Sequence, residues 1–139
     1  MANVRNPKFF IVDDDAHCRM RFHRHLVNLG YNNNILFDNG VDCLARLDMN
    51  PDVVFLDYDM KPINGMDVLQ KIKQVNPNIH VLFISSHKDM NMAVNAIQKG
   101  AFDYIYKGEK DLDTISEIIT KILTMRQFYA KLRDFDLIS

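Results

Sequence analysis

The chain has 139 residues, of which 47% are hydrophobic and 25% are charged, and its formal net charge is −1. This length suits one domain with a real core, and the composition excludes disordered, fibrous and disulfide-rich proteins. Basic and acidic residues are interspersed, which argues against direct nucleic-acid binding by this segment. We expect one domain over residues 1–139, with a core at about 8–125 and a C-terminal helix extension or linker at 126–139.

Two features indicate a cytoplasmic protein with no membrane contact. Residues 1–8 contain no apolar run of the signal-peptide type, and no apolar stretch approaches the ~20 residues that span a membrane. Cys18 and Cys43 are far apart in sequence and have no metal-type spacing. We therefore expect free thiols in a reducing compartment.

Five short apolar runs alternate with helix-type patterns along the chain. The runs are Phe9–Val12, Ile35–Phe37, Val53–Leu56, Val81–Ile84 and Phe102–Tyr106. Short, continuously apolar runs of this kind are typical of strands that are buried on both faces of a parallel sheet. The alternation predicts an α/β fold with right-handed crossovers, in which helices cover both faces of an open parallel sheet.

Four apolar stripes with steps of three and four residues predict the helices between these strands, each packing that face against the core. The stripes are Phe22, Leu26 and Leu29; Val41, Leu44 and Leu47; Met66, Leu69 and Ile72; and Met90, Val94 and Ile97. The expected N-caps include Asp15, Asp89 and Asp111.

The last segment carries an unbroken apolar pattern that is longer than a small domain needs. From Leu112 it continues through Ile115, Ile118, Ile122, Met125, Tyr129 and Leu132. A terminal helix folded back on its own domain is one interpretation. A coiled-coil-like dimer seam, or a linker to a further domain, is the other.

The first predicted helix carries a basic cluster of Arg19, Arg21, His23, Arg24 and His25. A solvated helix face is the favoured interpretation. The alternative is a docking patch for an acidic partner surface.

Notable polar residues stand where predicted strands end. They are Asp13, Asp14 and Asp15 after the first strand, Asp57 and Asp59 after the third, Ser85 after the fourth, and Lys107 after the fifth. The ligand crevice of an open α/β sheet lies outside the carboxyl ends of its strands. We therefore expect these side chains to converge on one pocket.

Several carboxylates in one pocket repel one another unless a cation offsets their charge. Mg²⁺ (or Mn²⁺) suits the pocket, because such hard cations prefer oxygen ligands and are commonly held by a few carboxylates. Asp14 and Asp57 are the best direct ligands. The backbone carbonyl of Asp59 is a candidate third ligand, and Asp13 is expected to act through water.

A carboxylate is also a nucleophile toward phosphorus, giving an aspartyl phosphate. Asp57 is the candidate acceptor. Lys107 would offset charge on the transferring phosphoryl group, and Ser85 would donate a hydrogen bond to one of its oxygens.

Taken in order, these motifs resemble the receiver domain of two-component response regulators. They are Asp13-Asp14 after Phe-Phe-Ile-Val, Asp57 after Val-Val-Phe-Leu, Gly65 in the following turn, Ser85 after Leu-Phe-Ile, and Tyr104-Ile-Tyr-Lys107. The resemblance covers about Lys8 to Met125. It implies a flavodoxin-like, three-layer (βα)5 fold with a five-stranded parallel sheet in the order 2-1-3-4-5, to which this chain adds an extended C-terminal helix.

The resemblance also implies a mechanism. A histidine kinase or phosphotransfer protein would donate a phosphoryl group to Asp57, Ser85 would move inward, and Tyr104 would follow. The change would be read on the face formed by the fourth helix, fifth strand and fifth helix. That face or the C-terminal helix could form a homodimer. Asp59 and His87 are predicted to set the phosphate lifetime. The domain would be a signalling switch and not a turnover enzyme, with self-phosphorylation and autodephosphorylation as its only chemistry.

Two departures from the family pattern change what we expect locally. Gly108 stands where the family usually has a proline, often after a cis bond. We expect a trans Lys107–Gly108 bond with an altered loop, because a non-proline cis bond costs about 3–4 kcal/mol. The proline beside the metal site is also shifted by one position, at Met60-Lys61-Pro62.

Two alternative functions stay open. Leu56-Asp57-Tyr58-Asp59 also resembles the Asp-x-Asp box of haloacid-dehalogenase-type phosphatases, although that hypothesis leaves the acids after the first strand unexplained. The other alternative is a receiver-like binding domain that works without phosphate, favoured only by Gly108 and the shifted proline.

Overall fold

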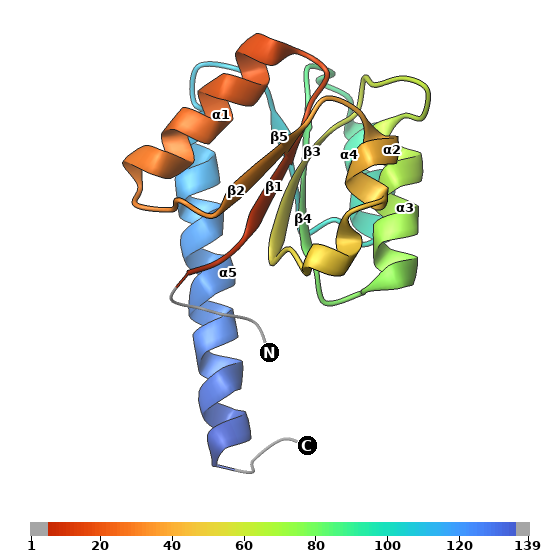
Figure 1. Ribbon diagram of the computed structural model, residues 1–139. Helices are drawn as coiled ribbons and strands as arrows, with labels where there is room; N and C mark the ends of the chain where they lie inside the picture. Colours follow the sequence, from red (N-terminus) through yellow and green to blue (C-terminus); the bar gives the residue numbers. More distant parts are fainter. Residues whose placement is uncertain (1–5, 136–139) are drawn as a thin grey trace.

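The computed structural model describes residues 6–135, which form a parallel sheet flanked by helices (Figure 1). The strands are β1 (Phe9–Val12), β2 (Asn34–Phe37), β3 (Val53–Asp57), β4 (His80–Ser85) and β5 (Asp103–Tyr106). Their order in the sheet is β2-β1-β3-β4-β5, and every pairing is parallel. The predicted strand order is confirmed, and Phe102 lies just before β5 instead of within it.

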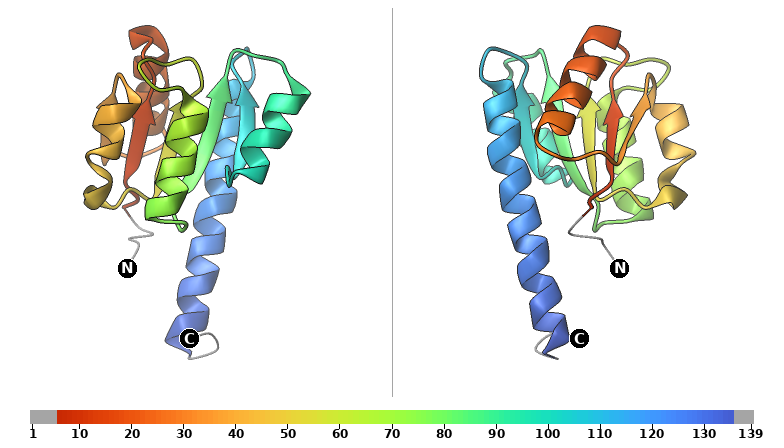
Figure 2. Two further views of the ribbon diagram at one scale, coloured as in Figure 1. Left: turned by 90° about the vertical axis from the view of Figure 1, so that its right-hand side faces the viewer. Right: turned by 60° about the vertical axis from the view of Figure 1, so that its left-hand side comes forward.

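The helices cover both faces of the sheet, as the flavodoxin-like three-layer fold requires. They are α1 (Ala16–Asn28), α2 (Gly40–Leu44), α3 (Gly65–Val75), α4 (Met90–Gln98) and α5 (Asp111–Asp134), with a 3-10 turn η1 (Leu47–Met49) after α2. Helices α1 and α5 lie on one face, and α2, α3 and α4 lie on the other (Figures 1 and 2).

The sheet separates two hydrophobic cores because alternate residues of each strand point to opposite faces. In β1, Phe10 and Val12 pack toward α2 and α3, whereas Phe9 and Ile11 pack toward α1 and α5. All four side chains are 0–1% exposed. Complete burial of such a side chain is worth roughly 1.5–3 kcal/mol. Burial on both faces explains why the strands appear in the sequence as continuous apolar runs.

Helix α2 follows the predicted stripe only in part, since Leu44 packs against the core but Val41 does not. Val41 is 48% exposed, and the buried residues are Gly40 and Cys43. A Cβ atom on Gly40 would lie 2.4 Å from Cγ2 of Val68 on α3, so only glycine permits this close approach of the two helices. The helix ends at Leu44, and Leu47 reaches the core from the separate turn η1.

Helix α4 turns its predicted apolar stripe to solvent. Met90, Val94 and Ile97 are 77%, 46% and 46% exposed, while Ala96 is completely buried and Met92 packs beside it. The expectation that this stripe faces the core is therefore wrong. A small residue such as Ala96 lets the helix lie close to the sheet, and the larger apolar residues are left outside.

Two of the predicted N-caps are confirmed and one is wrong. The Asp15 side chain accepts hydrogen bonds from the backbone N–H groups of His17 and Cys18, and Asp89 caps α4 in the same way. Asp111 is instead the first residue of α5, whose N-cap position is occupied by Lys110. Its carboxylate is directed toward another partner, described below.

Helix α5 has two halves with different surroundings. Ile115, Ile118 and Ile122 are buried against the sheet, whereas Met125 and Tyr129 are 40% and 48% exposed. The second half runs past the amino ends of the strands (Figure 2). Only the first half therefore folds back on the domain, and residues 136–139 of the expected extension lie outside the described residues. Within residues 6–135, no helix combines the length and apolarity needed to cross a membrane.

Candidate phosphoacceptor and metal site

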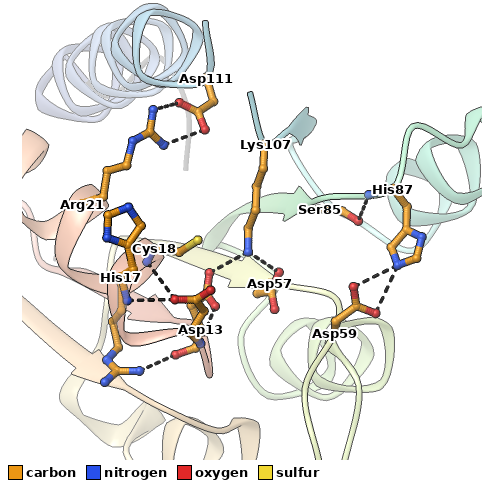
Figure 3. Close-up of polar contacts among 12 residues, drawn as sticks. Asp13, His17, Cys18, Arg21, Asp57, Asp59, Ser85, His87, Lys107 and Asp111 are labelled. Atoms are coloured by element: carbon orange, nitrogen blue, oxygen red, sulfur yellow. Dashed lines mark hydrogen bonds and ion pairs between the residues drawn. The ribbon is translucent and has the colours of Figure 1, made fainter. Parts of the chain in front are cut away.

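Three strands deliver charged side chains to one point at the carboxyl end of the sheet (Figure 3). Asp13 follows β1, Asp57 is the last residue of β3, and Lys107 follows β5. The ammonium Nζ of Lys107 lies 2.9 Å from Oδ2 of Asp13 and 2.9 Å from Oδ1 of Asp57. The two carboxylate side chains are only 3% and 4% exposed. The single Lys107 ammonium therefore pairs with two buried carboxylates.

A third acid completes a group that can hold a cation. One carboxylate oxygen from each of Asp13, Asp14 and Asp57 lies within 4.8 Å of the others, and Asp14 is exposed. No other group of this kind occurs within residues 6–135. An all-oxygen set with excess negative charge matches the ligand preference of Mg²⁺. The donor set fits the cofactor that the sequence predicted.

The charges in this pocket are not balanced. Burial raises the pKa of Asp57 to about 6, and the charge of Asp13 adds to this effect, although the hydrogen bond from Lys107 opposes it. Burial likewise raises the pKa of Asp13. Burial lowers the pKa of Lys107, but the two carboxylates more than offset it, so the pKa is raised and the ammonium stays charged. A divalent cation would relieve the remaining repulsion between the acids.

Gly65 is required by its closeness to the acceptor strand. Its N–H donates to the carbonyl of Tyr58 at 2.9 Å. A Cβ atom at this position would lie 2.2 Å from the backbone oxygen of Asp57, which no side chain can tolerate. The glycine that marked the family resemblance thus lets the start of α3 pack directly behind Asp57.

Ser85 and Tyr104 are connected through the backbone of His87. The buried Ser85 hydroxyl accepts a hydrogen bond from the His87 N–H at 3.0 Å. The Tyr104 hydroxyl donates to the His87 carbonyl, and its ring stacks on Phe83 with centroids 5.8 Å apart. The predicted switch residues therefore share one peptide segment as a common partner.

The Asp59 side chain is turned away from the acid group. Its carboxylate oxygens lie 2.9 and 3.2 Å from Nε2 of His87, and the two side chains are about half exposed. The ring of Tyr58 packs edge-on against His87 at 5.7 Å. The pair links the loop after β3 to the loop after β4, beside Asp57 (Figure 3).

The loop after Lys107 departs from the family pattern at Gly108. The cis peptide bond that the described residues contain is at Lys61–Pro62, so the Lys107–Gly108 bond is trans, as expected. The sequence did not predict the ion pair that Arg21 makes with Asp111 beside this loop. Neither residue carries a signal for it, because the two lie far apart in the chain.

The family model for the response regulator receiver domain matches residues 9–127. The chain belongs to this family. It is 34% identical over 119 residues to the DNA-binding transcriptional regulator NtrC of Escherichia coli, covering 85% of this chain and 25% of that protein. It is 32% identical to the chemotaxis protein CheY of Bacillus subtilis, covering 84% of this chain and 97% of CheY. A receiver domain protein from Clostridium thermocellum superposes with a TM-score of 0.80 at 25% identity, covering 88% and 98% of the two chains.

These matches confirm the resemblance and the function drawn from it: the domain is a phosphorylation-dependent switch of two-component signalling. They give no support to the phosphatase or to the phosphate-independent binding domain. The chain spans about a quarter of the NtrC relatives that it matches and nearly the whole of CheY. Receiver domains bind Mg²⁺ in an acidic pocket and work with histidine kinases or phosphotransfer proteins, and this chain has such a pocket.

Proposed function

We propose that Asp57 accepts a phosphoryl group from the phosphohistidine of a histidine kinase or phosphotransfer protein. The observation that carries this proposal is the single Lys107 ammonium held between the buried carboxylates of Asp13 and Asp57. Asp13, Asp14 and Asp57 would hold Mg²⁺ (or Mn²⁺), together with the backbone carbonyl of Asp59.

In the transfer, a carboxylate oxygen of Asp57 forms the new P–O bond. The bond between phosphorus and the donor nitrogen breaks, and its electron pair leaves with the imidazole. Lys107 stays protonated and neutralises an oxygen of the phosphoryl group. A bound Mg²⁺ would supply further charge stabilisation at the phosphoryl oxygens.

The phosphoryl group would change the partners of the Ser85 hydroxyl. To donate to a phosphoryl oxygen, this hydroxyl has to turn its O–H away from Met92 Sδ, to which it now donates at 3.9 Å, and a shift of Oγ toward Asp57 would weaken the bond that it accepts from the His87 N–H. The His87 segment then loses one of its anchors, and Tyr104, which donates to the His87 carbonyl, follows it. This gives a local charge event a route to the α4–β5–α5 face.

That face has the surface of a partner site. Met90, Val94 and Ile97 on α4 are exposed, and Tyr106 on β5 is 43% exposed beside them. Single exposed apolar residues are unremarkable, but a group of them on one face favours an interaction surface. We propose this face as the surface that output partners read, and as one of two homodimer contacts to test.

The second half of α5 is the alternative dimer contact, through the exposed Met125, Phe128 and Tyr129. We further propose that residues 1–139 act as one receiver domain in the cytoplasm, that this segment makes no direct contact with nucleic acid, and that its chemistry is limited to self-phosphorylation and slow autodephosphorylation.

Intact mass after incubation with acetyl phosphate and Mg²⁺ tests the acceptor. We expect an adduct of ~80 Da on the wild type, lost in Asp57→Ala and lost when a chelator is added beforehand. Asp59→Ala is the matched control, since it removes a neighbouring carboxylate that does not face the acid group. It should keep the adduct, whereas an Asp-x-Asp phosphatase would need both acids. An adduct on Asp57→Ala would contradict the proposal.

A further inference from the structure

A two-pronged ion pair joins α1 to the first residue of α5, directly after the loop that carries Lys107. The Nη1 and Nη2 atoms of Arg21 lie 2.8 and 2.6 Å from the two carboxylate oxygens of Asp111 (Figure 3). The Asp111 side chain is 1% exposed. A guanidinium that meets a carboxylate with both prongs fixes the orientation of both groups, beyond neutralising their charges. Arg21, one of the residues of the basic cluster on α1, is therefore paired within the domain, although 33% of its side chain stays exposed.

Asp111 in turn holds the backbone beside Lys107. Its Oδ2 accepts the N–H of Gly108 at 3.2 Å. On the other side, the N–H of Lys107 itself donates to the carbonyl of Ser85 at 2.8 Å. The backbone of Lys107 is thus fixed between β4 and the Asp111 carboxylate, which Arg21 holds in place.

We propose that Arg21 and Asp111 are positioning residues that aim Lys107 at Asp57 through the N–H of Gly108. A proline at position 108 has no N–H and could not form this bond. Glycine at this position therefore permits a way of fixing the loop that the usual family residue does not. The inference rests on the proposed role of Lys107 in phosphoryl transfer.

The path of the chain explains how this pair positions the Lys107 loop relative to the acids. Helix α1 begins directly after Asp13 and Asp14, with Asp15 as its cap. Arg21 stands on that helix, so its bond to Asp111 sets the distance between the acids and the Lys107 loop. Lysine has a long flexible side chain, and its charge stabilises a transferring phosphoryl group only if its backbone is held.

The test is the initial rate of phosphorylation of the full chain by acetyl phosphate, with Mg²⁺ affinity measured separately by calorimetry. In Arg21→Met we expect the rate to fall about 10-fold, at the lower end of what loss of an outer partner costs, with the Kd for Mg²⁺ changed by no more than about twofold. Asp13 and Asp14 directly follow β1 and Asp57 ends β3, so the strands hold the metal ligands without Arg21, and mainly the Lys107-dependent step should suffer. Arg21→Lys keeps the charge but not the two-pronged geometry, and its phosphorylation rate should lie between those of the wild type and Arg21→Met. This variant carries the test if Arg21→Met does not fold.

Arg126→Met is the matched control, because it breaks another Arg–Asp pair on α5, with Asp52, at the opposite end of the sheet. It should be phosphorylated at the wild-type rate. A wild-type rate in both Arg21 variants would overturn the inference, and so would an equal loss of rate and of Mg²⁺ affinity. If the wild type itself took no phosphoryl group, the proposed function would fail instead.

Discussion

Helix α5 makes an arginine–aspartate pair near each end of the sheet, Asp111 with Arg21 of α1 and Arg126 with Asp52, but the two ends differ in how their charges are matched. At the amino end, Arg126 donates to Oδ1 and the carbonyl of Asp52, to the carbonyl of Asn78 and to Nδ1 of His80. The other oxygen of Asp52 accepts the backbone N–H of Lys8 at 2.8 Å. Each charged group in this cluster has a partner within residues 6–135.

At the carboxyl end, Lys107 is shared between Asp13 and Asp57, and the exposed Asp14 adds a third negative charge. We expect the matched cluster to stabilise the fold, whereas the unmatched cluster is the one proposed to receive a cation and a phosphoryl group. The location of unbalanced buried charge, more than the number of ion pairs, therefore distinguishes the end of the sheet proposed to be functional.

The largest effect on stability should come from the amino end. Arg126→Met should lower the free energy of unfolding by about 3 kcal/mol, because removing one partner leaves the buried Asp52 carboxylate without its counter-charge. Urea unfolding measures this, with the exposed Arg133→Met on the same helix as control. Equal stability of the two variants would mean that the amino-end cluster is not structural.

The carboxyl end should show the opposite behaviour. At pH 7 in the presence of a chelator, Asp57→Asn should raise the free energy of unfolding by about 2–3 kcal/mol. Burial raises the pKa of Asp57 from 3.8 to about 6, and the variant no longer has a carboxyl whose ionisation costs the folded state this energy. The sign follows because the folded pKa of about 6 exceeds the unfolded value, so ionisation of Asp57 costs stability as pH rises through this range. The gain should therefore disappear by about pH 4. Urea unfolding at several pH values measures it, with Asp59→Asn as control, and destabilisation by Asp57→Asn at pH 7 would contradict the prediction.

His80 should give the amino end a pH dependence of reversed sign. Burial, with the charges of Arg126 and Lys73, lowers the pKa of His80 to about 4. The folded state therefore resists protonation, and stability falls as pH drops from about 6.5 toward 4. His80→Gln should reduce this loss in the free energy of unfolding by about 2 kcal/mol. The reduction is smaller than the full effect of the pKa change because the side chain is only partly buried. Unfolding at pH 7 and pH 4.5 measures the difference, and an unchanged slope would show that His80 does not titrate in this range.

The smallest effect concerns the phosphate lifetime. Replacing Asp59 and His87 together by alanine should shorten the lifetime severalfold, because their pair links the two loops beside Asp57 and limits the access of water. Decay of the adduct after removal of the donor measures it. An unchanged lifetime would remove the tuning role, and a longer lifetime would mean that the pair assists the attacking water. Asp67→Ala, an exposed acid on α3, is the control.

Local sequence patterns predicted most of the fold. Strand β1 and residues Val53–Leu56 of β3 appear as unbroken apolar runs because both of their faces are buried. The acids and Lys107 could be assigned to one site because parallel strands present their carboxyl ends at one edge. Gly65 could be placed beside the acceptor, but the reason for it, the contact with the Asp57 carbonyl, is visible only in the structure.

Helix orientation was harder to predict. In α4, the stripe of Met90, Val94 and Ile97 has helical spacing, yet Ala96 faces the core. Periodicity shows that a helix has an apolar side but not which side the sheet will accept, since a small residue allows a closer approach than a large one. The exposed face of α4 was for this reason invisible in the sequence.

The sequence alone determined the order of the strands and helices along the chain and the residues of the acidic pocket, because each depends on a local pattern or on where a strand ends. The tertiary structure decided which charges are paired. Arg21 meets Asp111 and Arg126 meets Asp52 across long separations in the chain. Such pairs depend on how far each helix is rotated and shifted against the sheet, and that is set by packing of the whole core and not by any one segment.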